Sequence, residues 1–597
     1  MTETRTFDIF DKFEKYPDTI GKMVLAEKKG NKWIKYNTQQ YKEISNFVSY
    51  GLLAMGLSRG SKIATITNNR PQWNFMDMGI AQIGAVHVPV YNTLSDSEFE
   101  YILNHCEAEI VVVANESLYK KIKPITDKIE KIKELYTFDQ VENAKNWEEI
   151  IELGKKSEIY YKQEVVEIKK SVKETDLLTI IYTSGTTGTP KGVMLSHQNL
   201  MTNAIASTFR IHLNYNHKVL SFLPLSHIFE HMTSYTYQLI GTSIYYAQSV
   251  ATIANDANEL QVDGFITVPR LLESVYEKII FKARGLSSTK RKILYWAINL
   301  GKKYEPFNNS WVYKQKLKIA DKLVFSKWRE ALSKNIIFIG VGGSALRPTL
   351  GRLFWAAGLP VFEGYGLSET SPIISVNYNK PGKVKLGSVG TILEGVTVKM
   401  LDDNEVLVKG PNVMMGYYKN PEETAKVIDK EGWFHTGDIA ELGEDGFLRI
   451  TDRKKEIFKM SNGKYIAPQV IENKLKESIM IGNSLVVGEN QKFAGVLISP
   501  NFNNLKEWCV KQKIKFQNEQ ELINIPKVKE FFQKEINQIN KTLGSFEQIR
   551  KFNLVCEEWT PQTGELSPTL KLKRKIIQKK YTKIIENMFY SKQLASV

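Results

Sequence analysis

The chain of 597 residues has little cysteine. Its three cysteines, Cys106, Cys509 and Cys556, are odd in number and far apart, which excludes a disulfide framework and a cysteine zinc site. A long apolar run is also missing: residues 78–90 form the longest one, and it is interrupted and too short to span a bilayer. The segment Met1–Lys12 lacks the apolar core of a signal peptide. We therefore expect a reduced, cytoplasmic protein, for which any membrane contact is peripheral, at the inner face.

Acidic residues are outnumbered by basic ones. Lysine and arginine total 81 and aspartate and glutamate 65, so the net charge is +16. A basic chain favours anionic partners, among them nucleotides, coenzyme A and acidic membrane surfaces. The charge is spread along the chain and no nucleic-acid-binding motif is present, so we expect no nucleic-acid partner. A chain of this length exceeds what one hydrophobic core supports, which predicts two or more domains.

Short apolar strands alternate with amphipathic helices in the first part of the chain. Residues 62–67 and 110–113 are predicted strands, and the capping box Ser95-x-x-Glu98 begins a helix between them. This alternation is typical of parallel sheets covered by helices on both faces, so the predicted fold class is α/β. Short alternating runs at 387–418 predict a small β subdomain, and residues 452–597 are expected to form a smaller α+β domain.

The densest functional signal is the loop from Thr183 to Gly192, which follows an apolar strand at 177–181. Its glycines let backbone N–H groups approach oxygen anions, its hydroxyls donate hydrogen bonds or reach a metal, and its lysine supplies charge. The loop therefore suits a polyphosphate. It is no Walker-type loop, because Pro190 rather than glycine precedes Lys191. Composition alone would also fit a polar surface turn.

Other stretches combine glycines or hydroxyls with aromatic and charged side chains. They are Leu223–His227, Gly342–Ala345, Glu363–Thr370, Gly432–Asp438, Thr451–Glu456 and Gly564–Lys575. An adenylate site needs an aromatic ring to stack on adenine, a hydroxyl for the α-phosphate and a carboxylate for magnesium, and Glu363–Thr370 supplies all three. Read singly, these stretches also have ordinary explanations: a tight turn, a surface acid or a solvated basic tail.

One pentapeptide allows a different chemistry. His227-Ile228-Phe229-Glu230-His231 fits the pattern H-x-x-E-H, in which two imidazoles on one helical face bind zinc and the glutamate acts as a base. No third-ligand motif follows it. A strand-end histidine with a second, internally bonded histidine nearby is the structural alternative, and we rank zinc binding last.

The loop Thr183–Gly188 leading to Pro190-Lys191-Gly192 resembles the signature loop of the adenylate-forming enzymes, which include acyl-CoA synthetases, luciferases and peptide-synthetase adenylation domains. The other stretches resemble further motifs of this family and follow in the expected order. A helical, basic insertion after Val268-Pro269-Arg270, running to about Lys327, resembles the long-chain members. The resemblance implies a large N-terminal domain, 1–451, with the ATP and acyl sites, and a mobile C-terminal domain, 452–597, joined by a hinge at about 452–456.

The resemblance also implies roles for individual residues of the ATP site. Thr183 and Glu369 would hold Mg²⁺. The phosphate-binding residues would be Thr183, Ser184, Gly185, Thr186, Thr187, Gly188 and Lys191. Adenine and AMP would contact Gly343, Ser344, Glu363, Gly364, Tyr365, Ser368 and Thr370, and ribose would contact Asp438 and Arg453.

For the acyl and coenzyme A sites, the resemblance places His227 where the carboxylate and later the thiol must pass. Lys455 would be the hinge pivot, and Gly463 would let the pantetheine arm of coenzyme A pass close to the backbone. Lys571 would be the catalytic lysine that enters the site during adenylation, with Lys573 as the rival. A lysine there can pair with both the carboxylate and an α-phosphate oxygen.

The implied activity is ATP-dependent conversion of a long-chain fatty acid to an acyl-adenylate and then to acyl-CoA. Transfer to an acyl-carrier protein is the alternative, since the loop and hinge motifs are shared. A zinc hydrolase using His227 and His231 and a non-enzymatic basic adaptor are the more remote hypotheses. The sequence does not decide acyl chain length or oligomeric state, and a homodimer stays open.

Overall fold

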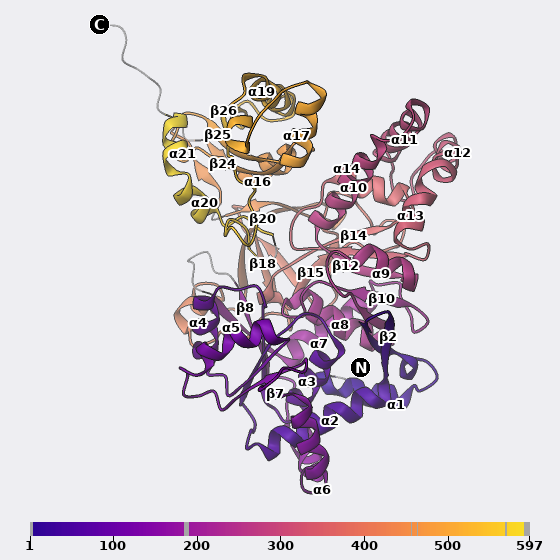
Figure 1. Ribbon diagram of the computed structural model, residues 1–597, viewed down its shortest axis with the longest axis vertical. Coiled ribbons are helices and arrows are strands. Elements are labelled where there is room, and N and C mark those ends of the chain that lie inside the picture. The colour runs from indigo at the N-terminus through magenta and orange to yellow at the C-terminus, as the bar shows by residue number, and fades with distance from the viewer. Residues whose placement is uncertain (1–3, 184–189, 455, 462–463, 568–569, 590–597) are drawn as a thin grey trace.

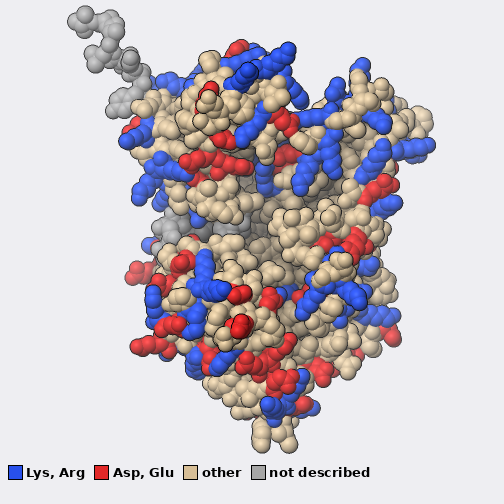
Figure 2. Space-filling model, viewed as in Figure 1, with Lys and Arg blue, Asp and Glu red and all other residues tan. Residues whose placement is uncertain are grey.

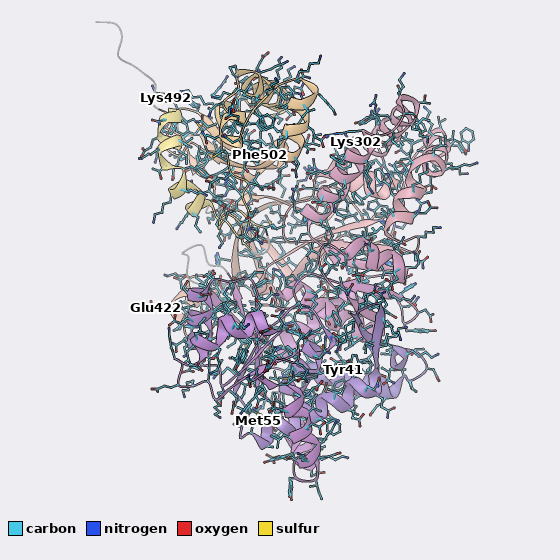
Figure 3. The ribbon with its side chains drawn as sticks, in the orientation of Figure 1. Tyr41, Met55, Lys302, Glu422, Lys492 and Phe502 are labelled. Carbon is cyan, nitrogen blue, oxygen red and sulfur yellow. The ribbon has the colours of Figure 1, made fainter. Side chains whose placement is uncertain are left out.

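The computed structural model describes residues 4–183, 190–454, 456–461, 464–567 and 570–589. Two large sheets with helices around them form most of the molecule, and a smaller unit carries the C-terminal end (Figure 1). Tyr41 and Phe502 belong to separate hydrophobic cores in these two parts (Figure 3). The predicted α/β class, with a large N-terminal and a smaller C-terminal domain, is confirmed.

The first sheet has nine strands in the order β16-β15-β14-β13-β12-β10-β11-β1-β2. Its central pairs, from β14 to β1, are parallel, and its edges are antiparallel. The strands are β1 (Val24–Lys29), β2 (Lys32–Asn37), β10 (Lys218–Ser221), β11 (Ser243–Tyr246), β12 (Gly264–Thr267), β13 (Phe338–Val341), β14 (Val361–Gly366), β15 (Ile373–Val376) and β16 (Thr391–Ile392).

The second sheet has eight strands in the order β19-β9-β8-β4-β3-β5-β6-β7. Its pairs from β8 to β7 are parallel, whereas β9 and β19 run antiparallel to their neighbours. The strands are β3 (Lys62–Ile66), β4 (Val86–Val90), β5 (Ile110–Val113), β6 (Glu134–Thr137), β7 (Lys145–Asn146), β8 (Leu177–Thr183), β9 (Lys191–Ser196) and β19 (Gly416–Tyr417). Each of β4 and β5 is buried along its whole length, as expected of strands covered on both faces.

Helices fill the space between the sheets and cover their outer faces. Every residue of α3 is buried, because this helix contacts β4 of one sheet and β1 of the other. The predicted capping box at Ser95 is confirmed at the start of α4. The helices are α1 (Ile9–Lys15), α2 (Thr38–Ala54), α3 (Pro71–Gln82), α4 (Asp96–His105), α5 (Glu116–Thr126), α6 (Glu148–Ser171), α7 (His197–Thr208), α8 (Ile228–Ile240), α9 (Ile253–Leu260), α10 (Pro269–Ala283), α11 (Ser288–Gly301), α12 (Trp311–Ala320), α13 (Ser326–Leu332) and α14 (Pro348–Ala356), with the short turns η1 (Thr6–Asp8), η2 (Ile20–Lys22), η3 (Asp321–Phe325) and η4 (Ser368–Thr370).

A small β subdomain is present as a four-stranded antiparallel sheet, in the order β17-β18-β20-β21. Its predicted bounds, 387–418, were wrong, because only two of its strands, β17 and β18, lie within them and the sheet continues to β21. Its strands are β17 (Thr397–Met400), β18 (Glu405–Lys409), β20 (Phe434–Leu442) and β21 (Leu448–Arg453), and α15 (Pro421–Ala425) lies in the β18–β20 connection. Because β21 runs to Arg453, the first residues of the predicted hinge still belong to this sheet.

The C-terminal part is built on the sheet β24-β25-β26, in which β24 and β25 form the predicted hairpin and β26 is parallel to β25. Its own core contains Leu475, Val496, Leu505 and Phe532. The elements are β22 (Phe458–Lys459), β23 (Tyr465–Ile466), α16 (Pro468–Leu475), β24 (Ile481–Val487), β25 (Ala494–Pro500), α17 (Phe502–Lys511), α18 (Glu519–Leu522), α19 (Pro526–Asn540), β26 (Ile549–Leu554), α20 (Arg574–Lys580) and α21 (Thr582–Phe589).

Candidate functional site

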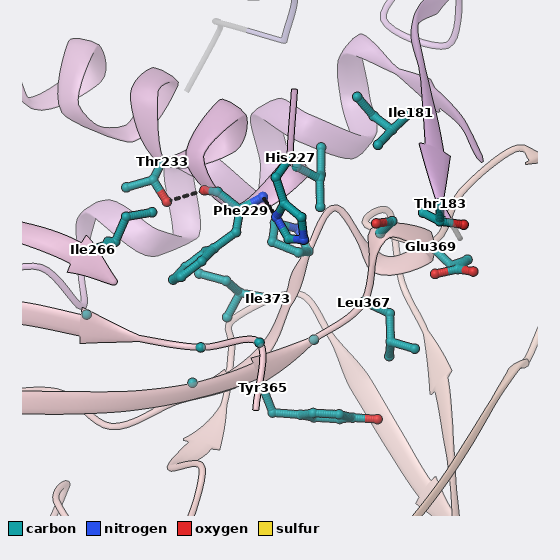
Figure 4. A pocket seen from close by; sticks show the side chains of 18 of the residues that line it. Ile181, Thr183, His227, Phe229, Thr233, Ile266, Tyr365, Leu367, Glu369 and Ile373 are labelled. Carbon is teal, nitrogen blue, oxygen red and sulfur yellow. Dashed lines mark hydrogen bonds between the residues drawn. The ribbon is translucent and has the colours of Figure 1, made fainter. Parts of the chain in front are cut away.

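A cavity of about 270 Å³ lies where strand ends of both large sheets meet the small β subdomain and the C-terminal part. Parallel strands end together at one edge of a sheet, which is where binding clefts of open α/β sheets form. Figure 4 shows this cavity with side chains from β8, β12, β14, η4 and α8 around it. Of the predicted site residues, its lining includes Thr183, His227, Gly343, Gly364, Tyr365, Ser368, Glu369, Arg453, Lys571 and Lys573.

One end of the cavity carries oxygen donors suited to a divalent cation. Thr183 is the last residue of β8 and Glu369 lies in η4, and the Thr183 hydroxyl and the Glu369 carboxylate face the same space (Figure 4). The Tyr417 hydroxyl donates to Glu369 Oε1 at 2.9 Å, which fixes the carboxylate. Hydroxyl and carboxylate oxygens are the ligands that Mg²⁺ prefers, so this pair fits the predicted metal.

The rest of the predicted phosphate loop is only partly described. Ser184, Gly185, Thr186, Thr187 and Gly188 lie outside the described residues. Lys191 lies beyond them on β9, where its ammonium pairs with Glu423 of α15 at 2.5 Å and sits 5.0 Å from the centre of the Tyr417 ring. In this structure the charge of Lys191 is therefore directed at Glu423, outside the cavity lining.

Asp438 is the anchor of the predicted nucleoside end. Asp438 is 3% exposed; its carboxylate accepts a hydrogen bond from the Tyr365 hydroxyl at 2.7 Å and forms an ion pair with Arg453, Nε to Oδ1 at 2.9 Å. Asp438 and Arg453 are paired across β20 and β21, so the sheet register sets this contact. Burial, followed by the nearby Asp438 charge, raises the pKa of Tyr365 well above its ordinary value. Each carboxylate oxygen keeps a second lone pair, which a ribose hydroxyl can use.

The other predicted adenine and AMP residues divide into two groups. Gly343, Gly364 and Ser368 line the cavity, and Gly343 has a φ of +84°, which favours glycine. The Thr370 hydroxyl instead donates to the Pro372 carbonyl at 2.7 Å inside its own turn, which leaves Ser368 as the hydroxyl that faces the cavity.

Glu363 and Ser344 lie next to the cavity, outside its lining. The Glu363 carboxyl accepts a hydrogen bond from the Gly387 N–H at 3.3 Å, and burial raises its pKa to about 8. Glu363 is therefore largely neutral near pH 7. A neutral carboxyl buried beside the predicted nucleotide site does not repel an anionic nucleotide, whereas a carboxylate would. The Ser344 side chain is exposed.

Lys571 reaches the cavity from the segment that precedes α20. The Ser567 N–H donates to the Lys571 carbonyl at 2.8 Å, and the Ser567 hydroxyl accepts from the Lys571 N–H at 3.0 Å, so two hydrogen bonds tie the Lys571 backbone to Ser567. The side chain keeps contact with the solvent of the cavity but is surrounded by protein atoms, and desolvation, followed by the Arg453 charge, lowers its pKa. The charges of Asp438 and Glu369 act on the pKa of Lys571 in the opposite direction.

Lys573 also lines the cavity, and its backbone N–H donates to the Glu565 carbonyl at 2.8 Å. The charges that surround Lys571 favour it over Lys573 as the lysine that meets the phosphates.

His227 caps the N-terminus of α8 and faces the same cavity. Its Nδ1 accepts a hydrogen bond from the Phe229 N–H at 3.2 Å, which leaves the proton of the neutral ring on Nε2. Burial, followed by the charge of Lys571, lowers the pKa of His227 to about 4. A neutral histidine with Nε2–H free to donate therefore lies beside the lysine that arrives from the C-terminal part.

Two contacts across the domains accompany this arrangement. Arg347, which precedes α14, donates to the carbonyl of Lys476 at 2.8 Å. Arg284, at the end of α10, pairs with Glu507 of α17. These contacts hold the C-terminal part against the N-terminal part.

Beyond His227 the cavity becomes apolar. Phe229 projects from the start of α8 toward the strands, beside Ile266 and Ile373 (Figure 4). Further side chains of this apolar lobe are Ile211, Phe338, Phe362 and Val376. A Cβ on Gly342 would lie 3.2 Å from the Phe229 ring, so glycine leaves space for that ring. Sequence reasoning missed these residues because they carry no motif, and the glycines at the end of β13 were the available signal.

The zinc hypothesis finds no support. His231 is buried, and its Nε2 lies 3.0 Å from the Tyr235 hydroxyl and 3.5 Å from Asp77 Oδ1, within an internal polar network. Among the described residues, no group of three or more His, Cys, Asp or Glu side chains is placed to hold a metal ion. Lys455, the predicted hinge pivot, and Gly463, the predicted coenzyme A residue, lie outside the described residues.

Family models and related sequences match nearly the whole length of this chain. Residues 11–418 match the AMP-binding enzyme family, and residues 455–593 match the AMP-binding enzyme C-terminal domain. This chain belongs to the AMP-binding enzyme family. Relatives include the long-chain-fatty-acid–CoA ligase ACSBG2 of Xenopus laevis, which is 30% identical over 96% of this chain and 82% of its own length. The long-chain-fatty-acid–CoA ligase FadD15 of Mycobacterium tuberculosis is 30% identical over 90% of both chains.

Solved structures share the fold of this AMP-binding enzyme. The anthranilate CoA ligase AuaEII, in complex with anthranoyl-AMP, superposes with a TM-score of 0.70 at 16% identity and covers 96% of this chain and 97% of its own. The Mycobacterium tuberculosis fatty acyl CoA synthetase superposes with a TM-score of 0.60 at 18% identity, over 97% of this chain and 99% of its own. In the described part of the chain, no helix combines the length and the apolar character needed to cross a membrane.

Proposed function

We propose that this AMP-binding enzyme is a long-chain fatty-acid–CoA ligase. The observation that carries the proposal is a single cavity with oxygen donors and a nucleoside anchor at one end, an apolar lobe at the other, and His227 and Lys571 between them. A fatty acid needs an apolar channel that ends beside the α-phosphorus of ATP, and this arrangement provides one. The long-chain relatives at 30% identity support the same substrate class.

In the proposed first half-reaction, a carboxylate oxygen of the fatty acid attacks the α-phosphorus of ATP. The bond between that phosphorus and the bridging oxygen breaks, and pyrophosphate leaves with its electron pair. The Lys571 ammonium, which lines the cavity, offsets the negative charge that grows on the α-phosphate oxygens. His227 Nε2–H donates to the carboxylate and orients it. Mg²⁺ bound by Thr183 and Glu369 would neutralise polyphosphate charge.

In the proposed second half-reaction, the thiol of coenzyme A loses its proton to solvent and its sulfur attacks the acyl carbon. The acyl–phosphate C–O bond breaks, and AMP leaves with the electron pair of that bond. Lys571 occupies space that the thiol must cross to reach His227. We infer that the C-terminal domain, residues 452–597, turns about Lys455 and withdraws this lysine, which is a hinge motion. Gly463 would then let the pantetheine arm approach the backbone.

Two finer features belong to the proposal. The first is the acceptor: coenzyme A is favoured over an acyl-carrier protein by the naming of the relatives. The second is a peripheral contact with a membrane, where long-chain fatty acids reside.

The test is pyrophosphate exchange and thioester formation across fatty acids of graded length, with coenzyme A and acyl-carrier protein compared as acceptors. We expect exchange that depends on a fatty acid and rises with chain length, and thioester formation with coenzyme A. Exchange driven by amino acids or aryl acids instead of fatty acids would overturn the substrate class, and thioester formation only on the carrier protein would overturn the acceptor.

A further inference from the structure

The positive charge of the chain is concentrated in one region. Residues 269–332, which comprise α10 to α13, contain 15 lysines and arginines against 5 acidic residues, a net charge of +10 out of +16. This corrects the expectation that the charge is spread along the chain. In Figure 1, α11 and α12 project from the upper right of the molecule, and Figure 2 shows blue side chains gathered over the same region.

Large apolar side chains are exposed among these charges. Trp311 is 73% exposed, and Val312, Ile319 and Leu323 follow it on α12 and η3. At 3.6 residues per turn, positions 311, 312, 319 and 323 fall on one side of the helix. Water contact with such side chains is unfavourable, and a contiguous apolar stripe on a surface marks a place where a partner binds.

The neighbouring helix α11 adds cations and aromatic rings at helical spacing. Arg291, Lys292, Tyr295 and Trp296 line a shallow surface pocket on it. Lys290, Arg291 and Lys292 have no acidic partner among the residues that the structure describes. Unpaired cations beside tryptophan and tyrosine match the headgroup zone of a bilayer, where phosphates meet the edge of the acyl region.

We propose that α11, α12 and η3 form a surface that docks on an anionic lipid bilayer, which deepens and rests on the proposed fatty-acid ligase function. The charge selects an anionic partner. A second copy would bring another net +10 to the same face and would be repelled. Nucleic acid could bind the cations and stack on the aromatic rings, but it has no apolar region that would bury Val312, Ile319 and Leu323.

A bilayer can bind both the cations of α11 and the exposed apolar side chains of α12 and η3. Lipid phosphates pair with the lysines and arginines of α11, while Trp311, Val312 and Ile319 enter the boundary between headgroups and acyl chains. Long-chain fatty acids partition into the same layer, so docking would bring the enzyme to its substrate.

The test is co-sedimentation of the full chain with vesicles of phosphatidylcholine alone or mixed with phosphatidylglycerol. Each cation near an anionic surface contributes roughly fivefold to binding, so loss of three cations weakens binding about a hundredfold. Because K290E/R291E/K292E also adds three negative charges, it should bind the mixed vesicles at least that much more weakly. A matched control, K155E/K156E/K162E on the exposed face of α6, makes the same change in net charge at the opposite end of the molecule (Figure 1) and should bind nearly as wild type does. The variant W311S/V312S should also bind more weakly, and its residual binding, which is mostly electrostatic, should fall with salt at least as steeply as wild-type binding does.

Equal losses in the two charge triples would show a bulk charge effect and overturn the proposal, as would unchanged binding in K290E/R291E/K292E. Binding that nuclease treatment abolishes would point to nucleic acid and also overturn it. Pyrophosphate exchange with a short, water-soluble fatty acid is measured on every variant. We expect exchange to be unchanged in the variants, since the substituted residues lie outside the cavity. Absence of exchange in the wild type would count against the ligase proposal, but the vesicle-binding result could still be interpreted independently.

Discussion

Replacement of Lys571 by alanine is the sharpest test of the proposed chemistry. The substitution removes the charge that lines one cavity with Glu369 and His227. Loss of one preorganised donor to developing oxyanion charge costs about 3–4 kcal/mol, or roughly 10²–10³ in rate. We expect adenylate formation, followed by pyrophosphate exchange, to fall by that factor. Transfer from a supplied acyl-adenylate to coenzyme A should stay within about twofold, because Lys571 has left the site in that step.

The matched control is Lys573→Ala, which removes a lysine from the same segment and the same cavity lining. It should leave adenylate formation within about threefold of wild type. Equal loss of both half-reactions in Lys571→Ala would refute the reasoning, and a larger loss in Lys573→Ala would reassign the role to that residue.

The pH dependence of adenylation follows from the same lysine. Desolvation lowers the pKa of Lys571. Because the charged ammonium form stabilises the transition state, adenylation activity is present below that pKa and is lost as pH rises through it. We expect the loss of adenylation activity at alkaline pH to begin below the ordinary pKa of a lysine side chain. In Lys571→Arg, whose side chain stays charged, residual activity should persist to higher pH. An unchanged alkaline limb in this variant would show that another group titrates.

Three further substitutions probe the rest of the cavity. Tyr365→Phe removes the hydrogen bond from the Tyr365 hydroxyl to buried Asp438 and should raise the KM for ATP about tenfold, with little change for the fatty acid; equal changes for both substrates would count against a nucleoside role. Glu369→Gln should raise the Mg²⁺ concentration needed for half-maximal pyrophosphate exchange by about tenfold, and an unaltered magnesium titration would remove the residue from the metal site. Gly342→Ala should push the Phe229 ring into the apolar lobe and lower kcat/KM for long fatty acids several-fold relative to short ones, whereas a uniform loss across chain lengths would indicate general damage to the fold.

Much of the fold was readable from local patterns. The capping box at Ser95 and the hairpin β24–β25 are short-range features, and both lie where the sequence predicts them. Patterns of this kind depend on hydrogen bonds and side-chain periodicity within a few residues, which a single segment contains. The order of the strands within the two sheets depends on contacts between distant segments and was not predicted.

The motifs identified the family and most of the polar site, because a phosphate or metal site demands particular residue types at close spacing. Tertiary structure decided which of those residues meet. It turned Ser368 toward the cavity and Thr370 into its own turn, and it paired Tyr365 with Asp438. It also assembled the apolar lobe around Phe229, whose members have no spacing rule because any large apolar side chain fills space equally well.

By itself, the sequence determined the chemistry that this protein carries: the phosphate loop, the carboxylates and the basic C-terminal segment. The tertiary structure alone decided that Lys571 and His227 lie in one cavity, more than 300 positions apart along the chain. The physical reason is that local motifs encode which groups are present, whereas distances between them arise from the packing of sheets, helices and domains. The same packing leaves the apolar and cationic side chains of α11 and α12 together on one exposed surface.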